Sequence, residues 1–468
     1  MSLTRFLDFL HFLAQFFPPD HSWSYLKYLG EPILQTIAMG VGSIFIAALI
    51  AFPLGVIIGT KMPGWRIVYA ALAAVRSIPD LTMAILCVVI VGIGLGAGLI
   101  ALILYYSAAM GKLFGEMFLS ADPAPLDALR ATGASRLSLA GFGLIPLKLN
   151  DTISYSVYEL ESAMRCAVIV GAAGAGGLGT ELVGSINNFD YQRVTTLILV
   201  IVLLITLMDR FCWLVKKIPV VAIVLVPAAI WSVIYCWPHF FAAQHAREVF
   251  TGMWPPKLNA KEVHALPVLI LQTLGMAAGG TFFAAMVALP CSVMAARGVA
   301  APRLIIMAIR RVLDLARAIP EVIWGLLLIM FIRTGMVVGI IALALHSTGV
   351  LGKLFAESLE NVPTAPIQAL NATGASRISV AAFGHLPLAF KPIAVHSLFR
   401  LEWNVRAATV VGIIGAGGIG EALFENQQLF FYHQMLSYLL VTLVLVGILD
   451  LASNRLRNRY EISWKAME

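Results

Sequence analysis

The chain contains little charge. Asp, Glu, Lys and Arg make up only 12% of its 468 residues, whereas hydrophobic residues make up 60%. A soluble domain carries about 25% charged residues, so this composition excludes an ordinary soluble protein. A mean hydropathy of +0.89 indicates an integral membrane protein. The net charge of +7 comes from basic residues in short loops beside apolar runs, so it predicts membrane topology and not nucleic-acid binding.

Cysteines and catalytic motifs are also scarce. Five cysteines without paired spacing support neither a disulfide framework nor a zinc site. No Gly-x-x-x-x-Gly-Lys-Ser/Thr motif occurs, so we do not expect this chain to bind ATP itself. The irregular spacing of His239, His245 and His264 predicts no metal site. Because no nucleophile, base and orienting residue stand together, we expect a chain without a cofactor that is not an enzyme.

Long uncharged runs are present instead. Residues 32–60 and 218–238 are each uncharged and exceed the roughly 20 residues that cross a bilayer as a helix. Five apolar spans are expected in each half, with a linking span at 218–237 between the halves. They are 33–60, 67–90, 91–110, 150–173 and 194–214 in the first half, and 266–292, 304–330, 335–351, 391–414 and 434–452 in the second. The sequence therefore predicts an all-α membrane protein with about 11 transmembrane helices.

The two halves repeat one another. The six residues Ala-Thr-Gly-Ala-Ser-Arg occur at 131–136 and again at 372–377, and much of each half aligns at this offset of 241. Gln35-Thr36 and Gln272-Thr273 match at an offset of 237, so the length difference lies in a loop. We expect four regions: an outer or interfacial segment at 1–32, a first membrane domain at 33–217, a linking helix and outer loop at 218–265, and a second membrane domain at 266–460.

The linking span gives both halves the same orientation. Two five-span copies joined directly would point in opposite directions, so one extra span makes the repeat parallel. Basic residues at 61, 66, 216, 217, 297 and 303 and in the C-terminal segment then share one side, which the positive-inside rule identifies as cytoplasmic. Both repeated polar segments face the cytoplasm in this topology, and the expected interfacial stretch 3–17 lies outside.

Each repeated polar segment has the pattern of a short helix, a glycine turn and a second helix. The glycine is Gly133 or Gly374, and thirteen residues later stands Pro146 or Pro387. A single such segment would be an ordinary loop, but two copies with one identical core favour two equivalent docking elements. The residues assigned to them are Asp127, Ala128, Gly133, Ala134, Ser135, Arg136 and Pro146, and Gln368, Ala369, Gly374, Ala375, Ser376, Arg377 and Pro387.

These segments resemble the cytoplasmic coupling motif of ABC importer permeases. That motif reads Glu-Ala-Ala, three residues, Gly, nine residues, Ile, any residue, Leu-Pro. This chain departs from it at Asp127 and Gln368 and at Gly143 and Gly384, where the motif has Glu and Ile. The run from Arg400 to Gly420 is similar to the signature of phosphonate-type permeases.

The resemblance implies two permease halves fused in one chain, as part of an ATP-driven importer for phosphonate or a related phosphorus oxyanion. It implies that two copies of a cytoplasmic ATPase, which hold ATP and Mg, dock on the repeated segments. It also implies an extracytoplasmic substrate-binding protein and a location in a bacterial inner membrane, surrounded by lipid. An ion-gradient-driven secondary transporter or channel is the alternative, but it leaves the twin segments unexplained. A membrane enzyme would need a catalytic cluster that the sequence lacks.

Charged residues within the apolar spans are candidates for a substrate pathway or gate. Structural ion pairs are the competing interpretation, because residues four apart share one helix face. The first half also differs from the second, with Glu159 at the position of Arg400 and Ala163 at the position of Asn404. The candidates are Arg76, Asp80, Glu161, Arg165, Arg317, Glu321, Arg400, Glu402, Asn404 and Arg406.

Glycine-rich runs follow the fourth span of each half. They contain the spacing of a dinucleotide-binding loop, but an apolar helix precedes each run where that fold has a strand. We expect a hinge or close helix packing instead. The glycines assigned to it are Gly174, Gly176 and Gly177, and Gly415, Gly417 and Gly418.

Overall fold

The structure is a computed structural model that describes residues 14–217, 225–236, 251–299, 301–332 and 334–465. These residues form helices and no strand. The chain divides into two compact units, Met1–Gly252 and Met253–Glu468. Most of the expected interfacial stretch 3–17, both ends of the linking span, and His239 and His245 lie outside the described residues. His264 lies within a helix.

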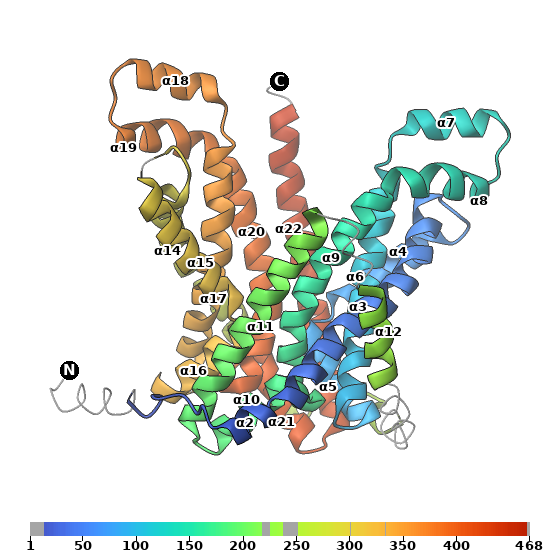
Figure 1. The fold of residues 1–468 in the computed structure, drawn as a ribbon. Helices are drawn as coiled ribbons and strands as arrows, with labels where there is room; N and C mark the ends of the chain where they lie inside the picture. The colour runs from blue at the N-terminus through green and yellow to red at the C-terminus, as the bar shows by residue number, and fades with distance from the viewer. Residues whose placement is uncertain (1–13, 218–224, 237–250, 300, 333, 466–468) are drawn as a thin grey trace. The chain divides into compact units, whose positions relative to one another are not determined.

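The first unit is built around the long helices α3, α6, α9 and α11 (Figure 1). Helix α3 packs along α6 and α9, with glycines of α3 against Phe114 and Phe118 of α6. The helices are α2 (Trp23–Tyr28), α3 (Gly30–Gly59), α4 (Trp65–Ser77), α5 (Asp80–Val91), α6 (Leu95–Leu119), α7 (Pro123–Ala131), α8 (Arg136–Leu139), α9 (Ile145–Val170), α10 (Gly177–Asn187), α11 (Tyr191–Lys217) and α12 (Leu225–Cys236).

The second unit repeats this order. Helix α14 packs along α17 as α3 does along α6, and Asn259 and Glu262 form a reciprocal cap at its start. The helices are α14 (Ala260–Ala295), α15 (Arg303–Ala318), α16 (Glu321–Ile332), α17 (Met336–Glu360), α18 (Thr364–Ala372), α19 (Arg377–Val380), α20 (Leu386–Val411), α21 (Ile419–Gln428) and α22 (Tyr432–Lys465).

The all-helical membrane architecture is confirmed. By length and composition, the described residues contain seven helices able to cross a membrane, or up to nine if each of two bent helix pairs counts as one span. The two further spans expected from the sequence correspond to α12, described over only 12 residues, and to α15 with α16, where α15 carries several charged residues. Most helices extend beyond the expected limits, as with α17, which reaches Glu360.

The expected spans 67–90 and 304–330 are each broken at a proline. Helix α4 and helix α5 meet at an angle of 89°, and Ile78 before Pro79 is extended. Ile319 before Pro320 is extended in the same way between α15 and α16. A proline ring clashes with a helical conformation at the preceding residue. Arg76 and Asp80, and likewise Arg317 and Glu321, therefore lie on different helices, and the expectation that each pair shares one helix face was wrong.

The glycine-rich runs break the fourth span of each unit. A π-helical turn ends α9 at Gly171–Ala175 and ends α20 at Gly412–Ala416, and α10 leaves the axis of α9 by 55°. All six glycines assigned to the hinge have a positive φ: Gly174, Gly176, Gly177, Gly415, Gly417 and Gly418. Other residues rarely adopt this backbone, so the composition of each run follows from the break.

Side chains of the first long helix bind the backbone freed by each break. The amide of Gly177 donates to Gln35 (2.8 Å), and the amide of Leu178 donates to Thr36 (3.0 Å). In the second unit Gln272 and Thr273 accept from the next helix start at 3.0 Å each. The repeated Gln-Thr pair is thus a cap supplied from another helix, which supports the first turn of α10 and α21.

Replacing Gly418 with alanine is expected to destabilise the second unit by about 1–3 kcal/mol, because an L-residue is strained at this backbone. The new Cβ would also lie 2.5 Å from the hydroxyl of Thr273. Gly447→Ala in α22 is the matched control, since nothing lies within 4 Å of its Cβ position. Thermal unfolding of the detergent-solubilised protein checks this, and equal midpoints for the two variants would contradict it.

Candidate functional site

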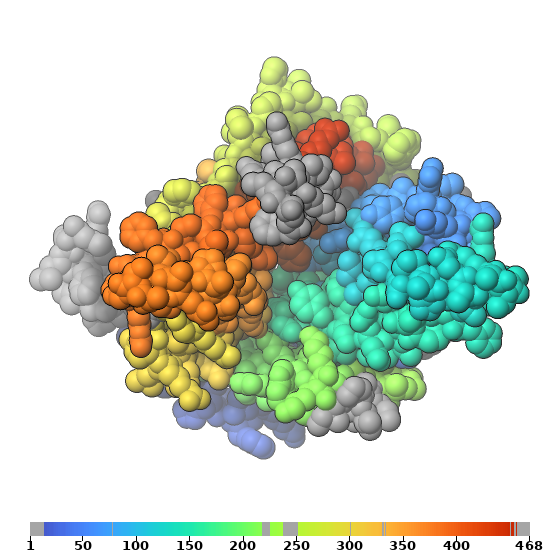
Figure 2. All heavy atoms as spheres, turned by 90° about the horizontal axis from the view of Figure 1, so that it is seen from above, coloured from blue at the N-terminus to red at the C-terminus, as the bar shows by residue number. Residues whose placement is uncertain are grey.

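The two repeated segments fold as hairpins of short helices. The first hairpin (residues 123–146) consists of α7, a turn at Gly133 and α8; the second hairpin (residues 364–387) consists of α18, a turn at Gly374 and α19. Each lies at the ends of neighbouring long helices of its own unit, and in the second unit α22 reaches the level of the hairpin (Figure 1). Figure 2 looks onto the hairpins and shows their outer surfaces uncovered by the other helices of the same unit. The expected helix, turn and helix are present in both copies.

Local chemistry fixes the turn of each hairpin. Gly133 and Gly374 have φ values of 78° and 76°, a left-handed backbone at which only glycine is free of strain. Two residues later, Ser135 and Ser376 accept the amides of Ser138 and Ser379 at 3.2 Å each, as serine commonly does at a helix start. The identical six-residue core therefore encodes one turn and one cap in both copies.

A π-helical turn joins α8 to α9 at Ala140–Leu144, and a second one joins α19 to α20 at Ala381–His385. It places Gly143 against α7, where a Cβ would lie 2.7 Å from Leu129 and 2.9 Å from Leu126. Gly384 lies against Leu370 and Ile367 in the same way. The glycines that depart from the coupling motif thus allow the two arms of each hairpin to pack closely.

Hydrogen bonds also hold the base of the first hairpin and the helix ends that precede the second hairpin. In the first unit Arg136 donates to the carbonyl of Lys61 (3.0 Å), which follows α3. In the second unit the hairpin follows α17, whose last residue, Glu360, accepts from Arg310 (2.5 Å) and from the amide of Arg297 (2.6 Å). Arg310 also donates to the carbonyl of Ala295 (2.9 Å). These contacts join the ends of α14, α15 and α17.

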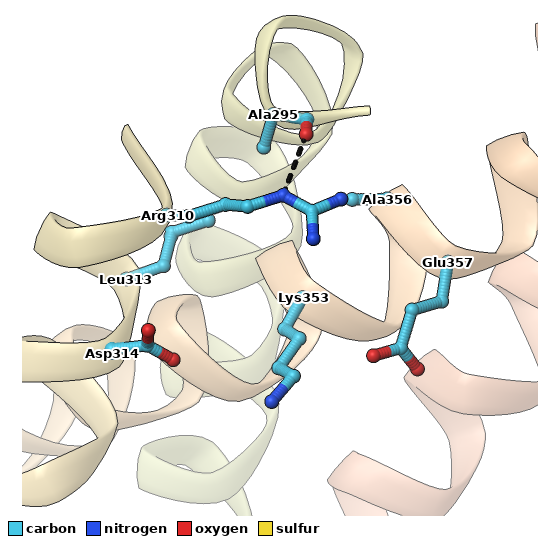
Figure 3. Close-up of a pocket in the computed structure, with 7 residues that line it drawn as sticks. All are labelled: Ala295, Arg310, Leu313, Asp314, Lys353, Ala356 and Glu357. Atoms are coloured by element: carbon cyan, nitrogen blue, oxygen red, sulfur yellow. Dashed lines mark hydrogen bonds between the residues drawn. The ribbon is translucent and has the colours of Figure 1, made fainter. Parts of the chain in front are cut away.

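A small cavity of about 90 Å³ lies beside Arg310. Figure 3 shows Arg310 reaching to Ala295, with Lys353 and Glu357 on the facing helix. A cavity of this size holds only a few water molecules. Because Arg310 is already bound to Glu360, we interpret this charged group as a brace and not as a substrate site.

The Glu-Arg pairs of the fourth span form within their helices. Glu161 and Arg165 are 3.1 Å apart, and Arg165 also lies 3.6 Å from Asp209 of α11. Glu402 and Arg406 are 2.8 Å apart. Ion pairing was one of the two interpretations given to these residues, and the geometry matches it.

The other intramembrane charges have separate partners. Asp80 accepts from the thiol of Cys166 (2.9 Å). Arg317 lies 3.5 Å from Asp314, and Glu321 lies 3.6 Å from His346. The contacts of Asp80 and Glu321 join different helices, so no local spacing indicates them, whereas Arg317 and Asp314 are three residues apart on one helix, a spacing that brings side chains together.

A buried polar chain runs through the second unit. Arg400 donates to Ser347 (2.8 Å), Ser347 donates to Asn404 (3.0 Å), and Asn404 donates to Thr281 (2.9 Å). All four side chains are buried. The Nη2 atom of Arg400 is buried and has no hydrogen-bond partner among the described residues. A buried guanidinium with a free donor is costly and is suited to an anion.

Among its described residues, the first unit has no equivalent chain of hydrogen bonds. At the positions of Arg400, Asn404 and Ser347 stand Glu159, Ala163 and Tyr106. Glu159 accepts a hydrogen bond from Tyr155, and Tyr106 donates to Ser162 (3.3 Å). The sequence difference between the two halves at Arg400 and Asn404 therefore extends to the hydrogen-bond partners of these residues.

The described residues contain no group of three or more His, Cys, Asp or Glu side chains that could hold a metal ion. The family model described as "binding-protein-dependent transport system inner membrane component" matches residues 51–217 and 288–462. The chain belongs to this family. It is a multi-pass membrane permease with two tandem copies of the family's domain, and it acts as a transport component.

Named relatives agree with this assignment. The permease is 26% identical over 464 residues to the phosphate-import permease protein PhnE of Mycolicibacterium smegmatis, covering 92% of this chain and 85% of the relative. It is 36% identical over 192 residues to the phosphite transport system permease protein PtxC of Stutzerimonas stutzeri, covering 41% and 70%. A solved chain of the inward-facing MetNI methionine ABC transporter is 21% identical with a TM-score of 0.40, covering 43% of this chain and 99% of that one.

Asn404→Ala is expected to lower the stability of the second unit by about 1–2 kcal/mol, because it leaves Ser347 and Thr281 without their buried partner. Asn371→Ala, at an exposed position of α18, is the control and should change little. The thermal unfolding midpoint of the purified permease measures both effects. An Asn404→Ala variant as stable as the control would show that the polar chain does not stabilise the fold.

Proposed function

We propose that this permease is the membrane subunit of an ATP-driven importer for a phosphorus oxyanion, and that its two hairpins each dock one copy of a cytoplasmic ATPase. The hairpins carry the proposal: they share one six-residue core, one turn and one cap. The ATPase copies would bind ATP and Mg, and a binding protein outside a bacterial inner membrane would deliver the substrate. The domain limits 33–217 and 266–460 are part of this proposal.

Rigidity is what the hairpins contribute to the mechanism. A closing movement of the ATPase pair moves the transmembrane helices only if each hairpin transmits force without bending. Close packing at Gly143 and Gly384 and the bond from Arg136 to Lys61 supply that stiffness. The glycine breaks after α9 and α20 provide the opposite property, since hinges absorb changes in backbone angle at few residues. Differential binding of the ATPase to two arrangements drives the transport cycle.

Arg400 is the residue that we assign to the substrate. Its free Nη2 donor suits an oxyanion of phosphate, phosphite or phosphonate type, because guanidinium groups match the geometry of such oxygens. The names of the relatives, which mention phosphate and phosphite, support this class. Arg165 and Arg406 have ionic partners, and Glu321 lies 3.6 Å from His346, so we assign these residues to holding the helices.

Replacing both Gly133 and Gly374 with valine should uncouple transport from ATP hydrolysis by about ten-fold or more, because a β-branched residue is strained at positive φ and the turn must rearrange. Gly141→Ala is the matched control: nothing lies within 4 Å of its Cβ position, and the second copy has Ala382 there. Substrate uptake and ATPase activity are measured together in proteoliposomes. Normal uptake by the double valine variant would refute the docking role of the hairpins.

Arg400→Gln should reduce uptake of a phosphorus oxyanion by about ten-fold or more, since one charged hydrogen bond contributes about 1.5–3 kcal/mol. Arg400→Lys should retain more activity, because it keeps the charge and loses only the planar donor geometry. Uptake of radiolabelled phosphite with saturating binding protein checks this, with membrane abundance as the control. Equal uptake by the parent and both variants would remove Arg400 from the pathway.

A further inference from the structure

The second arm of each hairpin consists of α8 or α19 and the π turn that follows it. It exposes large apolar side chains at equivalent positions in the two copies. Leu137 and Phe142 of the first hairpin are 72% and 81% exposed, and Ile378 and Phe383 of the second are 76% and 78% exposed. Hydrophobic side chains this open to solvent mark a surface that contacts something else. The docking role proposed above rests on the core, turn and cap that the hairpins share, and it assigns no function to these four side chains.

The π-helical turn aligns the exposed residues of each arm into one stripe. Residues five apart do not share a face of an α-helix, but one extra residue in the π turn compensates for that spacing. From Phe142 the stripe continues at Pro146, Leu149 and Ile153, all exposed. From Phe383 it continues at Pro387 and Phe390. The spacing of four and three residues in these continuations is that of one α-helical face.

The stripe continues onto an exposed apolar side of a helix that is long enough to cross a membrane. Helices α8 and α9, with the π turn between them, form one continuous helix that qualifies as part of a membrane span. Leu149 and Ile153 of α9 are apolar and exposed, as expected of side chains that face hydrocarbon. The other sides of the arm are covered: Gly143 contacts α7, and Leu139 and Leu144 are buried.

The position of the arm fits the membrane surface. In Figure 1 the arm with α8, and likewise the arm with α19, runs across the ends of the long helices of its own unit before the chain turns into α9 or α20. The helix from Arg136 to Val170 is longer than the roughly 20 residues that span hydrocarbon. Arg136, which also donates to Lys61, and Arg377 are both exposed, and basic side chains near a membrane surface attract lipid phosphates.

We propose that the second arm of each hairpin lies in the headgroup region of the bilayer, with Leu137 and Phe142, or Ile378 and Phe383, inserted among the acyl chains. The lipid surface then supports the arm from below, while α7 or α18 faces the ATPase. Apolar anchors with flanking basic residues are typical of helices that lie in the interface. The inference concerns lipid only and does not require that an ATPase binds.

Site-specific photocrosslinking tests the proposal. A benzophenone amino acid replaces Phe142 or Phe383 in the full chain, expressed with its partner subunits and irradiated in native membranes. The same amino acid at Ala128 or Ala369, exposed on α7 and α18, is the matched control. Phospholipid adducts, identified by mass, should be at least about five-fold more frequent at 142 and 383 than at the controls, because interfacial anchors reach the acyl boundary.

The outcomes separate this inference from the docking role. Lipid adducts at 142 and 383 support the inference. Absence of protein adducts at the control positions would count against ATPase docking and would leave the lipid inference intact. Adducts of Phe142 with a protein subunit, or no excess of lipid adducts there, overturn it. If those variants do not accumulate, the same label at Leu137 and Ile378 gives the same test.

A functional readout complements the crosslinking. Phe142→Ser together with Phe383→Ser should cause a partial loss of transport per ATP hydrolysed, whereas Phe142→Leu with Phe383→Leu should retain it, because leucine keeps the apolar contact. Loss of coupling in both double variants, or in neither, contradicts an anchoring role.

Discussion

A helix can be interrupted inside a membrane only where other groups bind the backbone that the break exposes. This constraint governs both units. Each has a broken fourth span, and the freed amides bind a Gln-Thr pair that the first long helix supplies. The cap joins the start of α10 to α3 and the start of α21 to α14, so the bend has a fixed partner on one side. The glycines of the break can adopt several backbone angles, whereas the cap holds the next helix start against the first long helix.

The two units use one architecture for different polar chemistry. In the second unit Arg400, Ser347, Asn404 and Thr281 form a connected chain, whereas the first unit has Glu159 and Tyr106 at the matching positions. Both arrangements are buried, and burial of polar groups in a low-dielectric interior makes any missing partner expensive. The side chains at these positions can differ between the two copies because, in the proposed function, one arginine is enough to bind one anion.

Periodic features of the sequence were sufficient to predict much of this fold. The long apolar runs, the repeat and the glycine turns of the hairpins depend on local composition, and the structure has them where they were expected. The proline breaks were also readable, because Ile78 and Ile319 precede prolines and are disfavoured in a helix; the spacing of the flanking charges directed attention to a shared helix face instead. The ion pairs at 161/165 and 402/406 lie within one turn and were accessible for the same local reason.

Other features depend on contacts between distant segments. The polar chain that includes Arg400 joins α14, α17 and α20, and no spacing in the sequence connects these three helices. The Gln-Thr pair was visible as a repeat, but its role as a cap requires knowing which helix starts beside it. The π turn was hidden for a different reason: its extra residue is stabilised by packing of Gly143 against leucines of α7, and the motif comparison registered that glycine only as a mismatch.

In the hairpins geometry restricts the number of residues, but it does not restrict the charge of the exposed side chains. Because successive residues of an α-helix are rotated by about 100°, deletion of one residue from a π turn would swing the whole arm around its axis. The residue count between turn and proline is therefore fixed by geometry. The exposed side chains of α7 and α18 have no such restriction. Asp127 and Arg130 form an ion pair in the first copy (2.7 Å), and Gln368 and Asn371 replace them in the second. Two identical ATPase copies would thus meet an ion pair on the first hairpin and two uncharged amide side chains on the second. Identical subunits would then dock on two chemically different surfaces.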